Sequence, residues 1–280
     1  METGIIFDTD IGYDPDDMFA LLELINNSKV DLIVTSDDPE GKRFIFLKKI
    51  LELTNKEIEV VQGSTLNKQH FIVDEFITGE NYKIKNNYIK RIKNIVDDYN
   101  QINYIGIGPF TNLSRFIGRY PNCKNKITLY QMGGSINYSR RPNWVEHNVK
   151  IDVKSAINLI NSGIRTYLVG AQTTFNNKIQ IDPNTDFYKK LERDSNSVLK
   201  ILRKHIDIYH KHSKSWPYMH DPLTVSVALG EKFVKFKRRK IVVEIDGNLK
   251  ESQNGSLVST SLPKSNTLAF MKYLNKSVFM

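Results

Sequence analysis

Cysteine is almost absent from the sequence, and long apolar runs are absent altogether. Cys123 is the only cysteine among 280 residues, so no intramolecular disulfide can form and no thiolate metal cluster is available. No run of about 18 apolar residues occurs, so we expect no membrane span. A strand is predicted almost at the start of the chain, which leaves no room for a signal peptide. A cytoplasmic protein fits these features best.

The chain also lacks a flexible linker, an internal repeat and a recognisable nucleic-acid-binding module. The net charge of +9 would suit a nucleic-acid partner, but the lysines are scattered. The densest basic block, residues 235–240, runs directly into an apolar strand, where lysines commonly protect an exposed edge from aggregation. We therefore expect a small-molecule substrate, and neither a nucleic acid polymer nor a membrane. The positive field would favour a phosphorylated substrate.

Short apolar runs alternate with glycine-containing loops and amphipathic segments along most of the chain. Strands are predicted near residues 30–36, 58–61, 102–107, 127–132 and 166–169, and helices near 16–26, 44–53, 83–99, 152–161, 183–213 and 264–277. Antiparallel strands are expected between 233 and 260, and the aperiodic stretch 64–82 is expected to form a loop near the site. The pattern predicts an α/β fold: a single domain over residues 1–280, with an open, mostly parallel sheet flanked by helices and a small antiparallel C-terminal addition.

A cluster of aspartates follows the first predicted strand and leads straight into a helix. Its members are Asp8, Asp10, Asp14, Asp16 and Asp17. One of them could simply cap the helix, but five carboxylates in one loop would repel one another unless a cation or a polyhydroxyl ligand bridged them. Oxygen-only ligands favour a hard ion such as calcium or magnesium. Ligands of open α/β sheets bind at the carboxyl ends of strands, so this loop is the predicted active centre.

Four further segments have the same polar character. They are Gly-Pro-Phe-Thr-Asn at 108–112, Met-Gly-Gly at 132–134, Glu-His-Asn at 146–148 and His-Asp-Pro at 220–222. Each alone has an ordinary interpretation as a tight turn or a helix cap. In this order, and together with Asp-Thr-Asp-Ile-Gly at 8–12, they resemble the motifs of the inosine–uridine-preferring nucleoside hydrolases, over residues 5–224.

The resemblance implies a calcium ion at the bottom of a pocket and a set of sugar-binding side chains. The implied calcium ligands are Asp10, Asp17, the backbone carbonyl of Ile107, and Asp221. The implied substrate contacts are Asp16 or Asp14 on the ribose hydroxyls, Glu146 and Asn148 on the sugar, Asn143 at its 5′ end, and Met132 of the Met-Gly-Gly motif. The expected partner is a nucleoside or nucleotide handled in salvage metabolism, and we expect a homo-oligomer, a dimer or a tetramer.

The predicted reaction is hydrolysis of the N-glycosidic bond of a ribonucleoside to free base and ribose. Such a bond breaks through a sugar with oxocarbenium character, so the site needs an activated water, nearby negative charge and help for the departing base. Asp10 is the predicted general base, acting together with the calcium ion. His220 is predicted to protonate or steady the base, because imidazole titrates near neutral pH.

Aromatic side chains on the long predicted helix form another candidate group. His205 and Tyr209 lie four residues apart and share a helix face. With Trp216 and Tyr218 nearby, they could stack on the base or close the site. Ordinary packing of these side chains in the core is an equal alternative.

The sequence departs from the family pattern at several pocket positions. Asp14-Pro15 is interposed in the first loop, Ser-Asp-Asp-Pro at 36–39 stands where an asparagine-bearing Gly-Asn loop is common, and His147 stands where an apolar or aromatic residue is common. A modified nucleoside or a 5′-monophosphate therefore stays open as the substrate. Two other functions also stay open: a haloacid-dehalogenase-like magnesium phosphatase with Asp8 as nucleophile, and a non-catalytic ribose- or nucleotide-binding relative.

Overall fold

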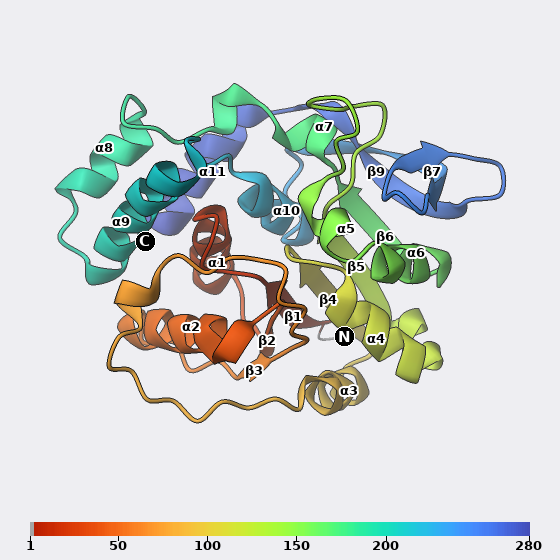
Figure 1. Ribbon diagram of the computed structural model, residues 1–280, viewed down its shortest axis with the longest axis horizontal. Helices are drawn as coiled ribbons and strands as arrows, with labels where there is room; N and C mark the ends of the chain where they lie inside the picture. The colour runs from red at the N-terminus through yellow and green to blue at the C-terminus, as the bar shows by residue number, and fades with distance from the viewer. Residues whose placement is uncertain (1–2) are drawn as a thin grey trace.

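The computed structural model describes residues 3–280, and the strands of this part of the chain form one sheet (Figure 1). The strand order is β3-β2-β1-β4-β5-β6-β9-β7-β8. The strands are β1 (Thr3–Thr9), β2 (Leu32–Thr35), β3 (Val60–Gln62), β4 (Gln101–Gly106), β5 (Ile127–Met132), β6 (Arg165–Val169), β7 (Val234–Val243), β8 (Leu249–Glu251) and β9 (Ser256–Ser265). Strands β1 to β6 and β9 are parallel, whereas β7 runs antiparallel to β8 and β9. The predicted α/β fold with an antiparallel C-terminal addition is confirmed.

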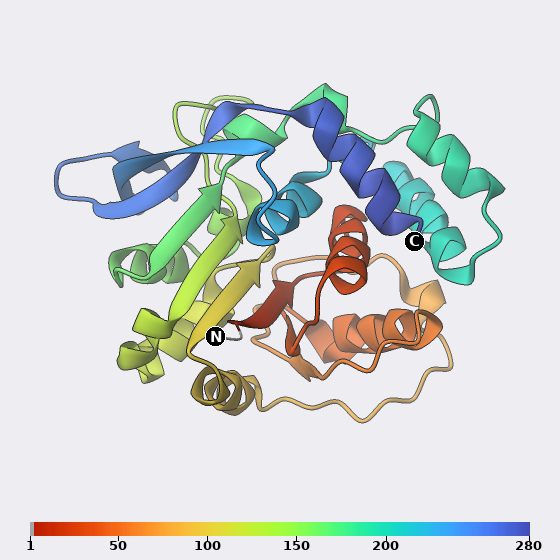
Figure 2. The ribbon, with the colours of Figure 1, turned by 180° about the vertical axis from the view of Figure 1, so that it is seen from behind.

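Helices cover both faces of the sheet (Figure 2). They are α1 (Asp16–Asn27), α2 (Lys42–Leu53), α3 (Tyr88–Asp98), α4 (Thr111–Arg119), α5 (His147–Ile151), α6 (Val153–Asn161), α7 (Ala171–Thr174), α8 (Asp186–Arg193), α9 (Ser197–Ser213), α10 (His220–Ala228) and α11 (Thr267–Val278). Ile5 and Phe7 of β1 join the core under α1, α2, α10 and α11, whereas Ile6 joins the core under α3, α4 and α6. Successive side chains of a strand point to opposite faces, so each buried parallel strand supplies both cores.

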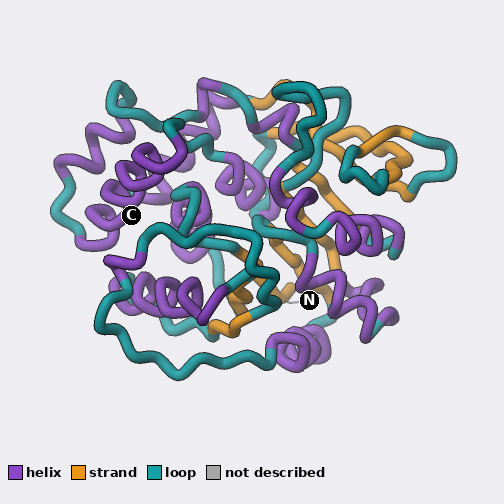
Figure 3. The backbone as a smooth tube through the Cα atoms, in the orientation of Figure 1, coloured by secondary structure: helices purple, strands orange, loops and turns teal. Residues whose placement is uncertain are grey.

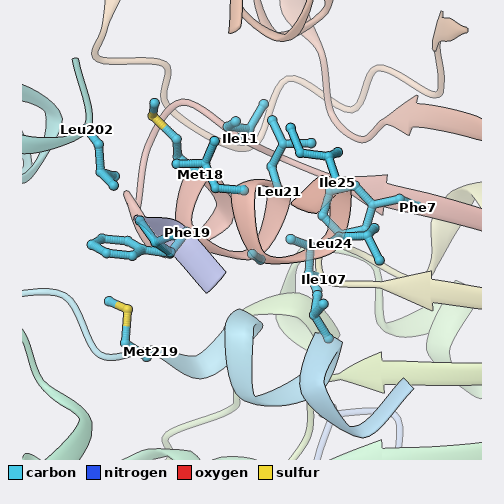
Figure 4. Packing of buried hydrophobic residues seen from close by; sticks show 14 of the residues in the cluster. Phe7, Ile11, Met18, Phe19, Leu21, Leu24, Ile25, Ile107, Leu202 and Met219 are labelled. Carbon is cyan, nitrogen blue, oxygen red and sulfur yellow. The ribbon is translucent and has the colours of Figure 1, made fainter. Parts of the chain in front are cut away.

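Helix α1 is buried along most of its length. Met18 and Phe19 lie among apolar side chains from distant parts of the chain, including Leu202 of α9 and Met219 (Figure 4). Burying an apolar side chain of this size contributes roughly 1.5–3 kcal/mol. This packing fixes the first turn of α1, and with it the end of the aspartate loop, at the edge of the sheet.

The structure differs from the sequence-based expectation in two helices. The helix predicted over 183–213 is two helices, because α8 ends at Arg193 and Asn196 starts α9 by accepting hydrogen bonds from the backbone N–H groups of Val198 and Leu199 at 2.8 and 3.4 Å. The helix predicted from residue 83 begins at Tyr88. A long loop therefore runs from β3 to α3 (Figure 3). Within residues 3–280, no helix combines the length and apolar character needed to cross a bilayer.

The strand order places the aspartate loop at a topological switch point. The chain leaves β1 toward β2 and β3 on one side, and returns to β4 on the other side of β1. Asp8 of β1 pairs in register with Gly106 of β4, so the loops that follow these two strands emerge side by side. Such a crevice at the carboxyl ends of the strands is where open α/β sheets bind ligands.

Candidate active site

A cavity of about 620 Å³ opens at this edge of the sheet, a volume within the usual range for small-molecule sites. Twelve of the thirteen predicted site residues line it: Asp10, Asp14, Asp16, Asp17, Ile107, Met132, Asn143, Glu146, Asn148, Tyr209, His220 and Asp221. They come from the loop after β1, the ends of β4 and β5, the segment before α5 and the helices α9 and α10. The tertiary fold thus brings together groups from opposite ends of the chain.

Three buried carboxylates meet on the wall of the cavity. Asp16, Asp17 and Asp221 each offer an oxygen atom within 4.8 Å of the others, and the backbone N–H of Asp221 donates to Asp16 Oδ2 at 3.2 Å. Burial raises the pKa of each carboxyl well above its usual range, and repulsion from nearby carboxylates of the same cavity, Asp10 and Asp14 among them, adds to the effect. A divalent cation would relieve both effects, so the donor set fits a hard metal ion held by oxygen ligands.

Asp10 lies beside this trio without being a member of it. Burial raises the pKa of Asp10, and its charge in turn raises the pKa of Asp17 and Asp221. Gly108, after β4, leaves the space that Asp10 needs, because a Cβ at that position would lie 3.0 Å from Asp10 Oδ1. The predicted ligand Ile107 lines the cavity, and its carbonyl accepts a hydrogen bond from Asn148 Nδ2 at 2.7 Å.

Two buried side chains that the sequence analysis did not identify hold the aspartate loop in shape. Thr9 Oγ1 donates to Asp17 Oδ1 at 2.5 Å. The fully buried Arg43 guanidinium donates to the carbonyls of Asp10 and Ile11, the latter at 2.7 Å, and to the carbonyl of His70 at 3.0 Å. A signal for Arg43 was present in the sequence, since it shares the apolar stripe of α2 with the core residues at 46, 47 and 50.

Asp8 belongs to the core below the cavity. Its carboxyl accepts hydrogen bonds from Ser36 Oγ at 2.6 Å, Tyr104 Oη at 2.5 Å and Asn112 Nδ2 at 3.0 Å. Burial raises the pKa of Asp8 to about 7. Because Asp8 does not line the cavity, the phosphatase alternative, which required it as an exposed nucleophile, is not supported.

Glu146 and Asn148 both line the cavity and brace its wall. The Glu146 carboxylate accepts from the backbone N–H groups of Gly134, Asn148 and Val149 at 2.7, 3.0 and 3.1 Å, and thereby caps α5. Asn148 Nδ2 also donates to the Met132 carbonyl at 3.2 Å. The Glu-His-Asn motif therefore caps a helix and also contributes Glu146 and Asn148 to the lining of the cavity.

His220 is buried against an aromatic wall. Its ring lies 4.5 Å from that of Phe175 and 5.5 Å from that of Tyr218. Burial lowers its pKa to about 3, with a smaller contribution from the charge of Arg140. The imidazole is therefore neutral near pH 7, which corrects the expectation that it titrates there. Its Nδ1 has no hydrogen-bond partner among the described residues.

His205 is the one predicted site residue that lies away from the cavity. It is fully buried, its Nε2 lies 3.1 Å from the carbonyl oxygen of Tyr13, and its ring meets Phe46 edge-on. The prediction that it contacts substrate is wrong, because its helix face packs into the core. Its neighbour Tyr209 lines the cavity, and a hydrogen bond from Tyr209 lowers the pKa of Asp14, which burial raises to about 6.

The other two aromatic candidates, Trp216 and Tyr218, lie in different surroundings. Trp216 stacks on His210 with ring centroids 3.8 Å apart and does not line the cavity. Tyr218 lines it, together with Trp144 and Phe175. Trp144 and Phe175 were not predicted as site residues, because neither stands in a recognisable motif.

Comparison with known proteins identifies the family over nearly the full length of the chain. The family described as inosine-uridine preferring nucleoside hydrolase matches residues 5–279. This chain belongs to that family. Members are N-ribohydrolases that cleave N-glycosidic bonds, and this nucleoside hydrolase is an enzyme of that class.

Several relatives of this nucleoside hydrolase have assigned names or solved structures. The pyrimidine-specific ribonucleoside hydrolase RihA of Escherichia coli O81 (strain ED1a) is 22% identical over 271 residues, covering 88% of this chain and 86% of RihA. A solved plant nucleoside hydrolase, PpNRh1, superposes with a TM-score of 0.84 at 17% identity, covering 99% of this chain and 98% of the other. The inosine-uridine preferring nucleoside hydrolase from Bacillus anthracis gives a TM-score of 0.80 at 18% identity, with 99% of each chain covered.

The departures of this nucleoside hydrolase from the family motifs have structural explanations. Asp37 accepts hydrogen bonds from the backbone N–H groups of residues 66–68 at 2.6 to 2.9 Å. Asp38 accepts hydrogen bonds from the N–H groups of Arg43 and Phe44 in the first turn of α2 at 2.8 and 3.0 Å. Neither lines the cavity. This pair orders the β3–α3 loop and the arginine that holds the active loop.

The β3–α3 loop, predicted to lie near the site, reaches it through Gln69. Gln69 lines the cavity, and its amide nitrogen is buried without a hydrogen-bond partner among the described residues. Its Oε1 lies 3.1 Å from Nε2 of His147, the residue that departs from the family pattern beside the sugar position. Gln69 and His147 are therefore linked to each other in the lining of the cavity that also holds Asp10.

Proposed function

We propose that this nucleoside hydrolase is calcium-dependent and uses Asp10 as the general base that activates water. The observation that carries the proposal is the meeting of Asp16, Asp17 and Asp221 in one cavity with Asp10 beside them. Asp17, Asp221, Asp10 and the Ile107 carbonyl would hold the ion. When bound, Ca²⁺ supplies positive charge that offsets the carboxylates and makes a nearby water more acidic.

In the proposed reaction Asp10 accepts a proton from water as the water oxygen bonds to C1′ of the ribose. The C1′–N bond breaks, its electron pair stays on the base nitrogen, and that nitrogen takes a proton from solvent to give free base, while Asp10 returns its proton to solvent. Asp16, or Asp14 in its place, would accept hydrogen bonds from the ribose hydroxyls, with Glu146 and Asn148 holding the rest of the sugar. The buried carboxylates stabilise positive charge on the ring as it develops.

The departing base would leave toward His220. A neutral imidazole in a dry aromatic setting can donate one hydrogen bond to the base nitrogen without a prior change of charge. Phe175, Tyr218 and Trp144 supply flat apolar surface on the same side. The low pKa of His220 supports hydrogen-bond donation rather than transfer from an imidazolium.

The proposal is tested by measuring free base released from a panel of ribonucleosides, with and without chelator. We expect release that stops on chelation and returns with added Ca²⁺. Recovery with Mg²⁺ or Zn²⁺ but not Ca²⁺ would contradict the choice of metal. Tight ribose binding with no base released at high enzyme concentration would identify the chain as a non-catalytic relative.

We further propose action on salvaged nucleosides in the cytoplasm, as a homo-oligomer. The single half-buried Cys123, which suits a reducing compartment, supports the location. Light scattering of the purified protein tests the subunit count.

A further inference from the structure

We propose that the mouth of the cavity binds an anionic group, the 5′-phosphate of a ribonucleoside 5′-monophosphate, through Arg141 and Lys150. The inference rests on the proposed function, because it places the sugar at Glu146 and Asn148. Neither basic residue has a part in breaking the glycosidic bond. They would instead decide which substrates are held in place for it.

The acidic and basic side chains that line the cavity lie at different depths below its opening. The carboxyls of Asp16, Asp17 and Asp221 are each 5% exposed or less, whereas Arg141 and Lys150 are exposed at the rim. A neutral nucleoside needs the buried carboxylates and a cation, but it carries nothing that calls for permanent positive charge at the entrance. A phosphate does, since it accepts strong charge-assisted hydrogen bonds from guanidinium and ammonium groups.

The two rim cations are not used by the protein itself. Within residues 3–280, neither Arg141 nor Lys150 forms an ion pair with a carboxylate. Asp246, an exposed carboxylate that also lines the cavity, accepts hydrogen bonds from the backbone N–H and side-chain amide of Asn248 at 2.9 and 2.8 Å. Arg141 and Lys150 are therefore available to a ligand.

The position of the two residues along the chain favours the sugar end of the substrate over the base. Both belong to the segment that leads into and through α5, which also supplies Glu146 and Asn148 (Figure 1). The third cation of this segment, Arg140, is engaged on the base side, where its guanidinium lies 4.2 Å from the centre of the Phe175 ring. Arg140 thus completes the aromatic wall, and Arg141 and Lys150 remain for the opposite end of the ligand.

The competing explanation is that these cations only offset the acidic interior. In that case removing one would change metal affinity and the hydrolysis of every substrate alike. A phosphate site predicts a change confined to substrates and products that carry the phosphate. The ratio between a nucleotide and its nucleoside separates the two explanations.

The experiment uses the full chain with Ca²⁺ and compares kcat/KM for uridine, uridine 5′-monophosphate and orotidine, whose base carries a carboxylate. The wild type should prefer the monophosphate. Arg141→Gln and Lys150→Gln should each lower the ratio of monophosphate to uridine by about tenfold or more. Lys154→Gln, which removes an exposed cation of α6 outside the cavity, is the matched control and should leave the ratio unchanged.

Equal kcat/KM for uridine and its monophosphate in the wild type would overturn the inference and leave the proposed function intact. A loss confined to orotidine in the two variants would overturn it as well, by assigning the cations to the base. Should no substrate be cleaved, the proposed function fails, and calorimetric binding of ribose 5-phosphate against ribose still tests the site. Weaker binding of ribose 5-phosphate in Arg141→Gln supports it, and unchanged binding contradicts it.

Discussion

Replacing Glu23 by Gln should make the protein more stable at neutral and alkaline pH. Glu23 lies on α1, is 0% exposed, and neither of its carboxylate oxygens has a hydrogen-bond partner among the described residues. Burial raises its pKa well above 4.5, and the charge of Glu231 adds to the effect. Tyr273 and Ser277 of α11 face the same region, and Ser277 Oγ is also buried without a partner.

The sign and size of the effect follow from proton linkage. Below pH 4.5 Glu23 is protonated in the folded and the unfolded chain, so it has no pH-dependent effect on the free energy of unfolding. Above pH 4.5 the unfolded chain releases the proton more readily than the folded one, so stability falls as pH rises toward the folded pKa. Each pH unit in which only the unfolded chain ionises removes about 1.4 kcal/mol. Gln cannot ionise, so Glu23→Gln avoids this loss.

Urea unfolding of wild type and Glu23→Gln at pH 4.5, 6 and 8 measures the difference directly. We expect similar free energies of unfolding at pH 4.5 and an advantage for the variant that grows with pH. Glu57→Gln, which alters an exposed carboxyl, is the matched control and should show no such growth. A difference that is the same at all three pH values, or a variant less stable at pH 8, would refute the reasoning. Glu23 does not line the cavity, so hydrolysis should be unaffected.

Three further predictions concern the site. Asp10→Asn should lower kcat by about 10²–10⁴ with an unchanged circular dichroism spectrum, and wild-type activity in this variant would exclude Asp10 as the base. His220→Ala should impair natural nucleosides much more than an activated nitrophenyl riboside, whose leaving group needs no hydrogen bond; equal losses would remove its proposed role. Gln69→Ala and His147→Ala should each reduce kcat, and because the two side chains are bonded to each other, the double variant should be little worse than either single one; fully additive losses in a double-mutant cycle would show that they act separately.

The sequence alone predicted the α/β fold, most of the strands and helices, and twelve of the residues that line the cavity. Parallel strands end at one edge of a sheet, so polar residues that follow successive apolar runs must gather there. That rule predicted the aspartate loop with Asp10 and Asp17 as the active centre, and the resemblance to the nucleoside hydrolases added Asp221 to the implied metal ligands. The length of a helical pattern was less decisive, because residues 194–196 interrupt it with a local cap that periodicity does not reveal.

Only the tertiary structure decided which side chains complete the site. Gln69 and Phe175 reach the cavity from segments without a motif. His205, which was predicted to contact substrate, is a core residue because its face of α9 packs against Phe46. Spacing along a helix or strand fixes which residues share a face, but not what that face packs against. The packing partners are set by contacts between residues far apart in sequence, and these contacts depend on the spatial order of the strands in the sheet.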